Sequence, residues 1–491
     1  MKIFLLIAVL IPIITGVLIP FIGFKEKKTR NIYIETAVII TSVIVWLLLL
    51  FPPEESMVFA RFTRAITLSL HIDGLSKIFA GLVSFLWPFA TLYSFEYICG
   101  EEDRDVFFMF YTMTYGVTLG IAFSEDVFTM YFFYELLTFV TVPLVMHTLS
   151  REAILASRTY LYYSLGGAGF SFIGLVFVII HSSNVDFAYG GVLSAAMTTE
   201  RTNVLLLIYV LAFMGFGVKA AVFPIGGWLP KASVAPTPVT ALLHAVAVVN
   251  AGAFAIIRLT YYSFGIEFLK GTWAQKVVMA VTIITILYAS SMALKETHLK
   301  RRLAYSTSSN LSYILFGVTL LTPLGLAGAL LHFVIHAFMK ICSFLCVGAI
   351  MHETGRTFVH QLNGLAKKLP HLFVCLAVSS LSLMGVPGLA GFVSKWHLAT
   401  AAVAAKNPEG YIGIAVLLVS SLLTAIYMMT MVLRGFFPET EKFSPSTIEG
   451  IHEPGIAMKL PIIVAAVITI VLGLFSGPLI DYAMKVASGV L

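Results

Sequence analysis

The chain has 491 residues, of which 59% are hydrophobic and 11% are charged, whereas soluble domains carry about a quarter charged residues. This composition excludes a soluble fold and predicts one membrane domain over residues 1–491. The net charge of +6 is spread over short loops without a long basic run. Nucleic acid is therefore not expected as a partner.

Cofactor chemistry is not expected in this chain. The four cysteines, Cys99, Cys342, Cys346 and Cys375, lie in apolar segments, and none forms a CxxC pair of the kind that holds zinc or an iron–sulfur cluster. Any redox reaction linked to this protein should take place in another chain.

Apolar segments long enough to cross a membrane recur along the whole sequence. Since lipid leaves no partner for free backbone groups, each is predicted to be helical. The first segment is too long for a signal peptide and lacks its cleavage pattern, so it is interpreted as a membrane helix. The fourteen predicted helices cover residues 3–24, 32–51, 74–97, 106–123, 127–149, 156–182, 203–225, 238–262, 276–294, 303–321, 324–351, 372–398, 412–436 and 461–484.

The loop charges predict an orientation. Most Lys and Arg residues lie in the odd-numbered loops, which the positive-inside rule places in the cytoplasm. Both termini should then lie on the outer side of the membrane. The even-numbered loops hold Arg61, Arg64, Arg201, Lys270, Lys276 and Lys406.

Two segments combine glycines, prolines and one lysine: GFGVKAAVFPIGGWLP (215–230) and LMGVPGLAGFVSKW (383–396). Paired interruptions in the two halves of a transporter indicate internal repeats and an ion path lined by unwound backbone. The alternative is that both segments are ordinary proline-kinked helices.

Ionisable residues within the predicted helices are candidates for function, because a charge inside a bilayer costs a few kcal/mol. The alternative is structural ion pairing that fixes helix packing. Removal from water favours a neutral lysine, whereas a carboxylate about 7 Å away favours the charged form by about 2.4 kcal/mol. The candidates are Glu135, Lys219, His244, His332, His336, Lys340 and Lys395.

Three of these residues share one helix at positions i, i+4 and i+8: His332, His336 and Lys340. This spacing stacks them on one face, which is the geometry of a proton relay. Two histidines four residues apart also suit zinc, but the glutamate of an HExxH motif and a third ligand are missing. A metal site is therefore not predicted.

The chain resembles the antiporter-like subunits of the superfamily that unites respiratory complex I, Mrp-type cation/proton antiporters and membrane-bound hydrogenases. The resemblance spans predicted helices five to twelve and favours a D-type Mrp subunit or a hydrogenase-linked subunit. It rests on YELLTF (134–139), GFGVKAAVFPIGGWLPKASVAPTPVTALLHAVAVVNAG (215–252), LKRRLAYSTSSNLSYILFG (299–317), ALLHFVIHAFMKICSFLCVGAI (329–350) and SLMGVPGLAGFVSKW (382–396).

The resemblance implies an all-α fold of two inverted five-helix repeats, with helices seven and twelve broken. The repeats would cover residues 106–262 and 276–436, with three N-terminal helices in 1–105 and a last helix in 461–491.

The resemblance also implies roles for the buried residues. Glu135 and Lys219 match the coupling pair of the family. His244, His332, His336 and Lys340 match groups that carry protons along a central axis, and Lys395 matches the lysine on the exit side.

Several loop positions depart from the family pattern. The common Trp-Leu-Pro-Asp-Ala-His has Lys231 and Ser233 in place of the Asp and the His. His298 stands two residues before Lys300, where an acidic residue is frequent. These changes concern a cytoplasmic entrance and leave the buried residues intact.

Three functions are compatible with the sequence. The first is a subunit that translocates protons, alone or coupled to sodium, with hydrophobic partner subunits in a prokaryotic cell membrane. That complex would be an oxidoreductase or a cation/proton antiporter. The second is a self-contained transporter of an organic solute, which would need a specific pocket beside the broken helices. The third is an inert membrane scaffold.

Overall fold

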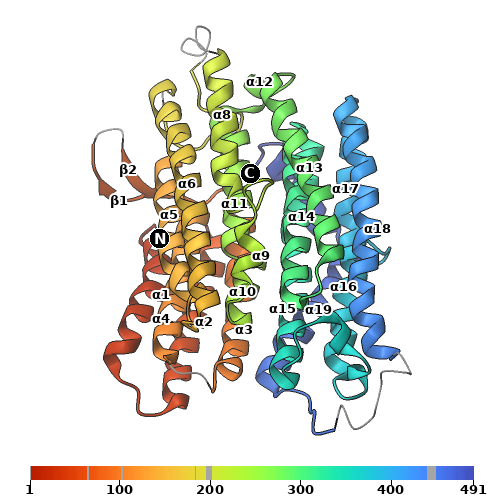
Figure 1. Cartoon of the computed structure of the whole chain (residues 1–491). Coiled ribbons are helices and arrows are strands. Elements are labelled where there is room, and N and C mark those ends of the chain that lie inside the picture. Colours follow the sequence, from red (N-terminus) through yellow and green to blue (C-terminus); the bar gives the residue numbers. More distant parts are fainter. Residues whose placement is uncertain (1, 64–65, 101–102, 183, 195–201, 439–448) are drawn as a thin grey trace.

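The computed structural model describes residues 2–63, 66–100, 103–182, 184–194, 202–438 and 449–491. Long helices run side by side through the molecule (Figure 1). In the described ranges, 11 helices are long and apolar enough to cross a membrane. Arg64 and Arg201, which were counted among the loop charges, lie outside the described residues.

The N-terminal part contains three long helices where the hydropathy predicts them. They are α1 (Ile3–Ile22), α2 (Lys27–Leu50) and α3 (Gly74–Tyr97). The connection between α2 and α3 also forms an antiparallel hairpin of β1 (Met57–Arg61) and β2 (Thr67–Leu70), in which Met57 lies opposite Leu70. The sequence analysis did not predict this hairpin.

The next part includes two segments in which the helix is interrupted. Predicted helix 203–225 ends at Gly217, and predicted helix 238–262 is divided at residues 246–247 and finishes as a π-helix. The elements are α4 (Arg104–Ala122), α5 (Val127–Val145), α6 (Arg151–His181), α8 (Thr202–Gly217), α9 (Trp228–Ala232), α10 (Thr237–Ala245), α11 (Val248–Ile257), η1 (Arg258–Phe264) and α12 (Ile266–Leu269).

The second half is arranged around α15, whose most apolar stretch is 94% buried. The helices are α13 (Trp273–Lys295), α14 (Leu299–Thr319), α15 (Pro323–Thr354), η2 (Val359–Leu362), η3 (Leu365–Lys367), α16 (Pro370–Met384), α17 (Ala390–Ala404), α18 (Pro408–Phe436), α19 (Ile456–Leu474) and α20 (Gly477–Ala487).

The prediction of one helix over 461–484 is wrong. Helix α19 ends at Leu474 and α20 begins at Gly477, with Pro478 in its first turn. A proline has no N–H to continue the preceding helix but is favoured at a helix start. The division therefore falls where the sequence has Gly-Pro.

The interruption at residues 218–227 is stabilised by side chains that satisfy its carbonyl groups and one in the last turn of α8. The Tyr134 hydroxyl donates to the Phe216 carbonyl at 3.0 Å, and the Trp228 indole donates to the Val218 carbonyl at 2.7 Å. Ser308 donates to the Ala221 carbonyl at 2.7 Å. Irregular backbone inside a membrane protein requires such partners.

A buried ion pair that the sequence analysis missed joins α3 to the π-helix η1. Arg258 is 1% exposed and contacts both carboxylate oxygens of Asp73, at 2.5 and 2.8 Å. Asp73 also caps α3 by accepting from the Ser76 N–H at 2.8 Å. Arg258 lies inside a predicted membrane helix. The buried lysines were selected because they are ionisable residues within such helices, and the same criterion would have selected Arg258.

The Asp73→Asn variant tests this ion pair. Asparagine still caps a helix well, but it leaves a buried guanidinium without its counter-ion, which costs about 3–5 kcal/mol. We expect a lower midpoint in thermal unfolding of the purified protein. Glu409→Gln is the matched control, because Glu409 contacts the exposed Lys276 at 3.8 Å and exposed pairs contribute about 0–1 kcal/mol. Equal shifts in both variants would contradict the assignment.

Candidate functional site

Glu135 and Lys219 lie near each other but are not in contact. Glu135 is in the middle of α5, and within the described ranges its buried Oε1 atom has no hydrogen-bond partner. Lys219 is 1% exposed and lies in the interruption after α8. Its ammonium donates to the Tyr134 carbonyl and lies 3.5 Å from the centroid of the Tyr134 ring. The Glu135 and Lys219 charges interact through space rather than by direct pairing.

A glycine on α11 allows the backbone around Lys219 to pack closely. A Cβ atom added at Gly252 would lie 2.5 Å from the Ala220 nitrogen and 3.1 Å from the Lys219 Cβ. Any larger residue at position 252 would therefore displace the interruption. The close approach of Gly252 therefore fixes the position of the backbone at Lys219.

His244 is a fully buried imidazole on α10, and neither ring nitrogen has a hydrogen-bond partner in the part of the chain that the structure describes. Its ring stacks on Phe344, with centroids 4.7 Å apart. The charges of Lys340 and Lys300 both act on it. Lys300 was predicted to lie outside the helix 303–321, but α14 begins at Leu299 and buries it, and its ammonium donates to the Ala235 carbonyl at 2.7 Å.

His332, His336 and Lys340 lie on one face of α15, as their spacing predicts, and each is 0% exposed. The two imidazole centroids are 5.9 Å apart. Lys340 donates to the Ser306 hydroxyl at 2.6 Å, and His332 Nδ1 lies 2.8 Å from the Ser394 hydroxyl. His332 Nε2 and both nitrogens of His336 have no partner among the described residues.

Two groups of hydroxyls between α14 and α18 were missed in the sequence analysis, and the first of them contacts Lys340 through Ser306. Tyr427 donates to Ser306 at 2.7 Å, and Tyr313 donates to Ser420 at 2.6 Å. Ser309 contacts the same Ser420 hydroxyl at 3.2 Å. The sequence carried a signal for these hydroxyl contacts. Ser306, Ser309 and Tyr313 are spaced i, i+3, i+7, and this spacing places their hydroxyl groups on one face of α14.

Lys395 lies on α17 and reaches back across the interruption at residues 385–389. Its ammonium donates to the Leu383 and Met384 carbonyls at 2.6 and 3.3 Å and to the Ser421 hydroxyl at 3.0 Å. The two carbonyls belong to the last turn of α16, which has no further helical N–H to bind them. Gly385, with φ of +92°, ends that helix.

The predicted residues thus form two groups. Tyr313 lies between His332 and Lys395, with its ring centroid 5.4 Å from the imidazole centroid and 5.2 Å from the ammonium. Through Tyr313 the structure brings Lys395 together with the α15 face. No described hydrogen bond joins Lys219 to His244.

The arrangement is suited to proton transfer. Imidazole and amine groups bind and release protons, and hydroxyl groups both donate and accept hydrogen bonds. Within the described ranges, no three His, Cys, Asp or Glu side chains are grouped so that they could hold a metal ion. We refer to Lys219, His244, Lys340, His336, His332 and Lys395 as the central series.

Comparison with known proteins gives a family match. Residues 124–424 match the family model described as NADH:quinone oxidoreductase/Mrp antiporter, TM. The chain is 29% identical to NADH-quinone oxidoreductase subunit N of Desulforudis audaxviator over 442 residues, covering 86% of this chain and 84% of that protein. It is 28% identical to Na(+)/H(+) antiporter subunit A1 of Staphylococcus aureus over 513 residues, covering 98% of this chain but 62% of that protein.

Two solved structures share the fold along nearly the whole chain. A chain of the Mrp complex from Dietzia sp. DQ12-45-1b matches with a TM-score of 0.84 and 22% identity, covering 99% of this chain and 97% of that chain. A chain of the membrane-bound sulfane sulfur reductase, an archaeal respiratory membrane complex, matches with a TM-score of 0.85 and 21% identity over the same shares.

Proposed function

The chain belongs to the NADH:quinone oxidoreductase/Mrp antiporter transmembrane family, and we propose that it translocates protons as one subunit of a multisubunit membrane complex. The observation that supports this function best is the burial of the central series. Lys219 is 1% exposed, and His244, Lys340, His336 and His332 are each 0% exposed. Titratable groups at such positions are costly and mark ion paths.

In this proposal Glu135 and Lys219 act as the coupling pair. Lys219 is held by a carbonyl and an aromatic ring rather than by the carboxylate, so a small movement changes its distance from Glu135 and its preference for a proton. His244, Lys340, His336 and His332 then pass protons along the centre, and Lys395 delivers them on the exit side.

We further propose fourteen membrane spans in two inverted five-helix repeats. Fourteen results when α8 is counted with α9, α10 with α11 and η1, and α16 with α17, and when the short helices α12 and α20 and the 3-10 helices η2 and η3 are not counted as spans. Hydrophobic subunits of the same complex and membrane lipid are the expected partners. Redox chemistry is assigned to other chains, and proton transport alone or coupled to sodium both fit the central series.

Removing either member of the coupling pair should abolish transport. We expect Lys219→Ala and Glu135→Ala to lower the rate of proton or cation transport in membrane vesicles by about tenfold or more, while the complex still assembles. Normal assembly is expected because the two side chains are not joined by a direct ion pair whose loss would strand a charge. Wild-type rates in both variants, at normal expression, would disprove the coupling role.

Substitutions of Lys340 separate a proton relay from a metal site. Histidine can still titrate, so Lys340→His should retain part of the transport rate, whereas Lys340→Met should lose it. Zinc coordination predicts the opposite, because a protonated lysine is not a ligand. Transport rates measured together with metal content by elemental analysis decide: stoichiometric zinc in an active Lys340→Met protein would overturn the relay.

Both termini should be reachable from outside the cell, since the loops on their side are poor in Lys and Arg. Cysteine tags at the two ends, labelled with an impermeant reagent in intact cells, test this orientation. Labelling that requires opened cells would show that the orientation is reversed.

A further inference from the structure

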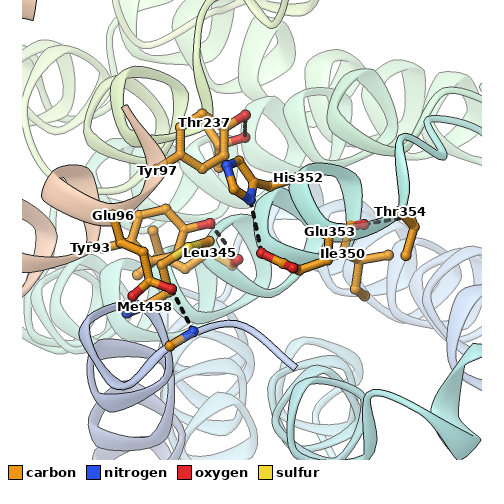
Figure 2. Close-up of polar contacts among 11 residues, drawn as sticks. Tyr93, Glu96, Tyr97, Thr237, Leu345, Ile350, His352, Glu353, Thr354 and Met458 are labelled. Carbon is orange, nitrogen blue, oxygen red and sulfur yellow. Dashed lines mark hydrogen bonds and ion pairs between the residues drawn. The ribbon is translucent and has the colours of Figure 1, made fainter. Parts of the chain in front are cut away.

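A cluster of polar side chains lies where the ends of four helices meet (Figure 2). Its residues are distinct from those of the central series. Tyr93, Glu96 and Tyr97 end α3, Thr237 begins α10, His352 and Glu353 end α15, and Met458 begins α19. Arg104, at the start of α4, Lys231, in α9, and Arg356, after α15, lie close in sequence to these helix ends. The cluster is therefore on the side that the loop charges assign to the cytoplasm.

His352 connects this cluster to water. Its side chain is 38% exposed, and its Nδ1 atom lies 2.9 Å from a Glu353 carboxylate oxygen. On the inner side its ring lies against Tyr97, with centroids 5.1 Å apart (Figure 2). His352, which is exposed and can titrate, thus contacts Tyr97, the first side chain on the way to the buried residues.

Tyr97 leads to a hydroxyl that is fully buried. The Thr237 hydroxyl donates to the Tyr97 hydroxyl at 3.1 Å, and Thr237 is 0% exposed. A Cβ atom added at Gly348 would lie 2.0 Å from Thr237 Cγ2. The absence of a side chain at Gly348 therefore lets α15 press against Thr237 and hold it beside Tyr97.

From Thr237 a polar stripe continues along α10 to the central series. Thr237, Thr240 and His244 are spaced i, i+3, i+7, which places them on one helix face over about 10 Å. Thr240 is 0% exposed and donates to the Thr237 carbonyl at 3.0 Å. His244 follows with both ring nitrogens unpartnered. Lys300 adds a buried positive charge beside the start of this stripe.

We infer that His352, Tyr97, Thr237 and Thr240 form the entrance by which protons from the Lys/Arg-rich side reach His244. This inference rests on the proposed function. His352 gives up a proton from a ring nitrogen, each hydroxyl in turn accepts a proton on a lone pair as it releases its own, and His244 takes up the last proton on a ring nitrogen, so that the hydroxyls end unchanged and His244 carries the positive charge. The step between Tyr97 and Thr237 uses a direct hydrogen bond, and in this inference bridging water molecules would carry the proton from His352 to Tyr97, from Thr237 to Thr240 and from Thr240 to His244.

The test uses the whole complex reconstituted in vesicles with a pH-sensitive dye. Thr237→Val keeps the shape of the side chain but removes the hydroxyl, and Tyr97→Phe does the same for the ring. Both should slow proton translocation by about tenfold or more. Thr237→Ser keeps the hydroxyl and should remain within about twofold of wild type. His352→Gln should be slowed in the same way as Tyr97→Phe.

Tyr209 and Thr260 supply a matched control, because their buried hydroxyls also lie 3.1 Å apart but away from the stripe. Tyr209→Phe and Thr260→Val should translocate protons at about the wild-type rate. If they are slowed as much as Tyr97→Phe and Thr237→Val, the loss reflects disturbed packing and the entrance is disproved.

Further outcomes separate the entrance from the proposed function. Wild-type rates in Thr237→Val and Tyr97→Phe, beside an inactive Lys340→Met, would overturn the entrance alone. A fully active Lys340→Met would overturn the function itself. A Thr237→Ser variant as slow as Thr237→Val would also reject the hydroxyl route. Should Thr237→Val fail to assemble, wild-type rates in both Tyr97→Phe and His352→Gln would reject it instead.

Discussion

An ammonium group inside a membrane needs oxygen atoms that replace its water, and in this protein the backbone supplies many of them. Lys219 binds the Tyr134 carbonyl, Lys340 the Leu303 carbonyl, and Lys395 the carbonyls of Leu383 and Met384. None of these lysines is within 4.0 Å of a described carboxylate. A carbonyl stabilises the charge only in part, so each lysine can give up its proton without stranding a buried carboxylate. Lys219 and Lys395 lie in or beside an interrupted helix, whereas Lys340 lies on the continuous α15.

The two interruptions meet this requirement in different ways. At residues 218–227 the lysine is part of the unwound segment, while tyrosine, tryptophan and serine side chains satisfy the carbonyls around it. At residues 385–389 the lysine lies in the following helix and binds the free carbonyls of the preceding one, where the helix dipole is negative. Lys395 is accordingly anchored by three oxygens, whereas Lys219 has one carbonyl and a ring. Lys219 is the more easily displaced, which agrees with a switching role for it and a delivering role for Lys395.

Hydropathy and spacing predicted much of this fold, since long apolar segments must be helical in lipid. The stacking of His332, His336 and Lys340 followed from helical periodicity alone. What could not be predicted depends on neighbours that are distant in sequence. The division at residues 246–247, the π-helix and the burial of Lys300 arise from packing between helices. The contact of Tyr97 with Thr237 joins residues 140 positions apart. Arg258 is a different case, because its position in an apolar segment was visible and was overlooked.

Charge balance along the central series limits how it can work. Glu135 is the one carboxylate among the residues assigned to transport, so a proton on a second lysine has no acidic partner there. Lys340 already interacts electrostatically with Lys395. Two ammonium groups about 10 Å apart at an effective dielectric near 20 repel each other by about 1.7 kcal/mol, or more than tenfold in occupancy. Under the proposed function, loading one site would therefore expel a proton from the next, and Glu135, whose buried oxygen has no hydrogen-bond partner among the described residues, would decide whether Lys219 starts that sequence. The proposed transport therefore requires that repulsion between like charges, rather than a continuous chain of hydrogen bonds, couple the Lys219 end of the series to Lys395.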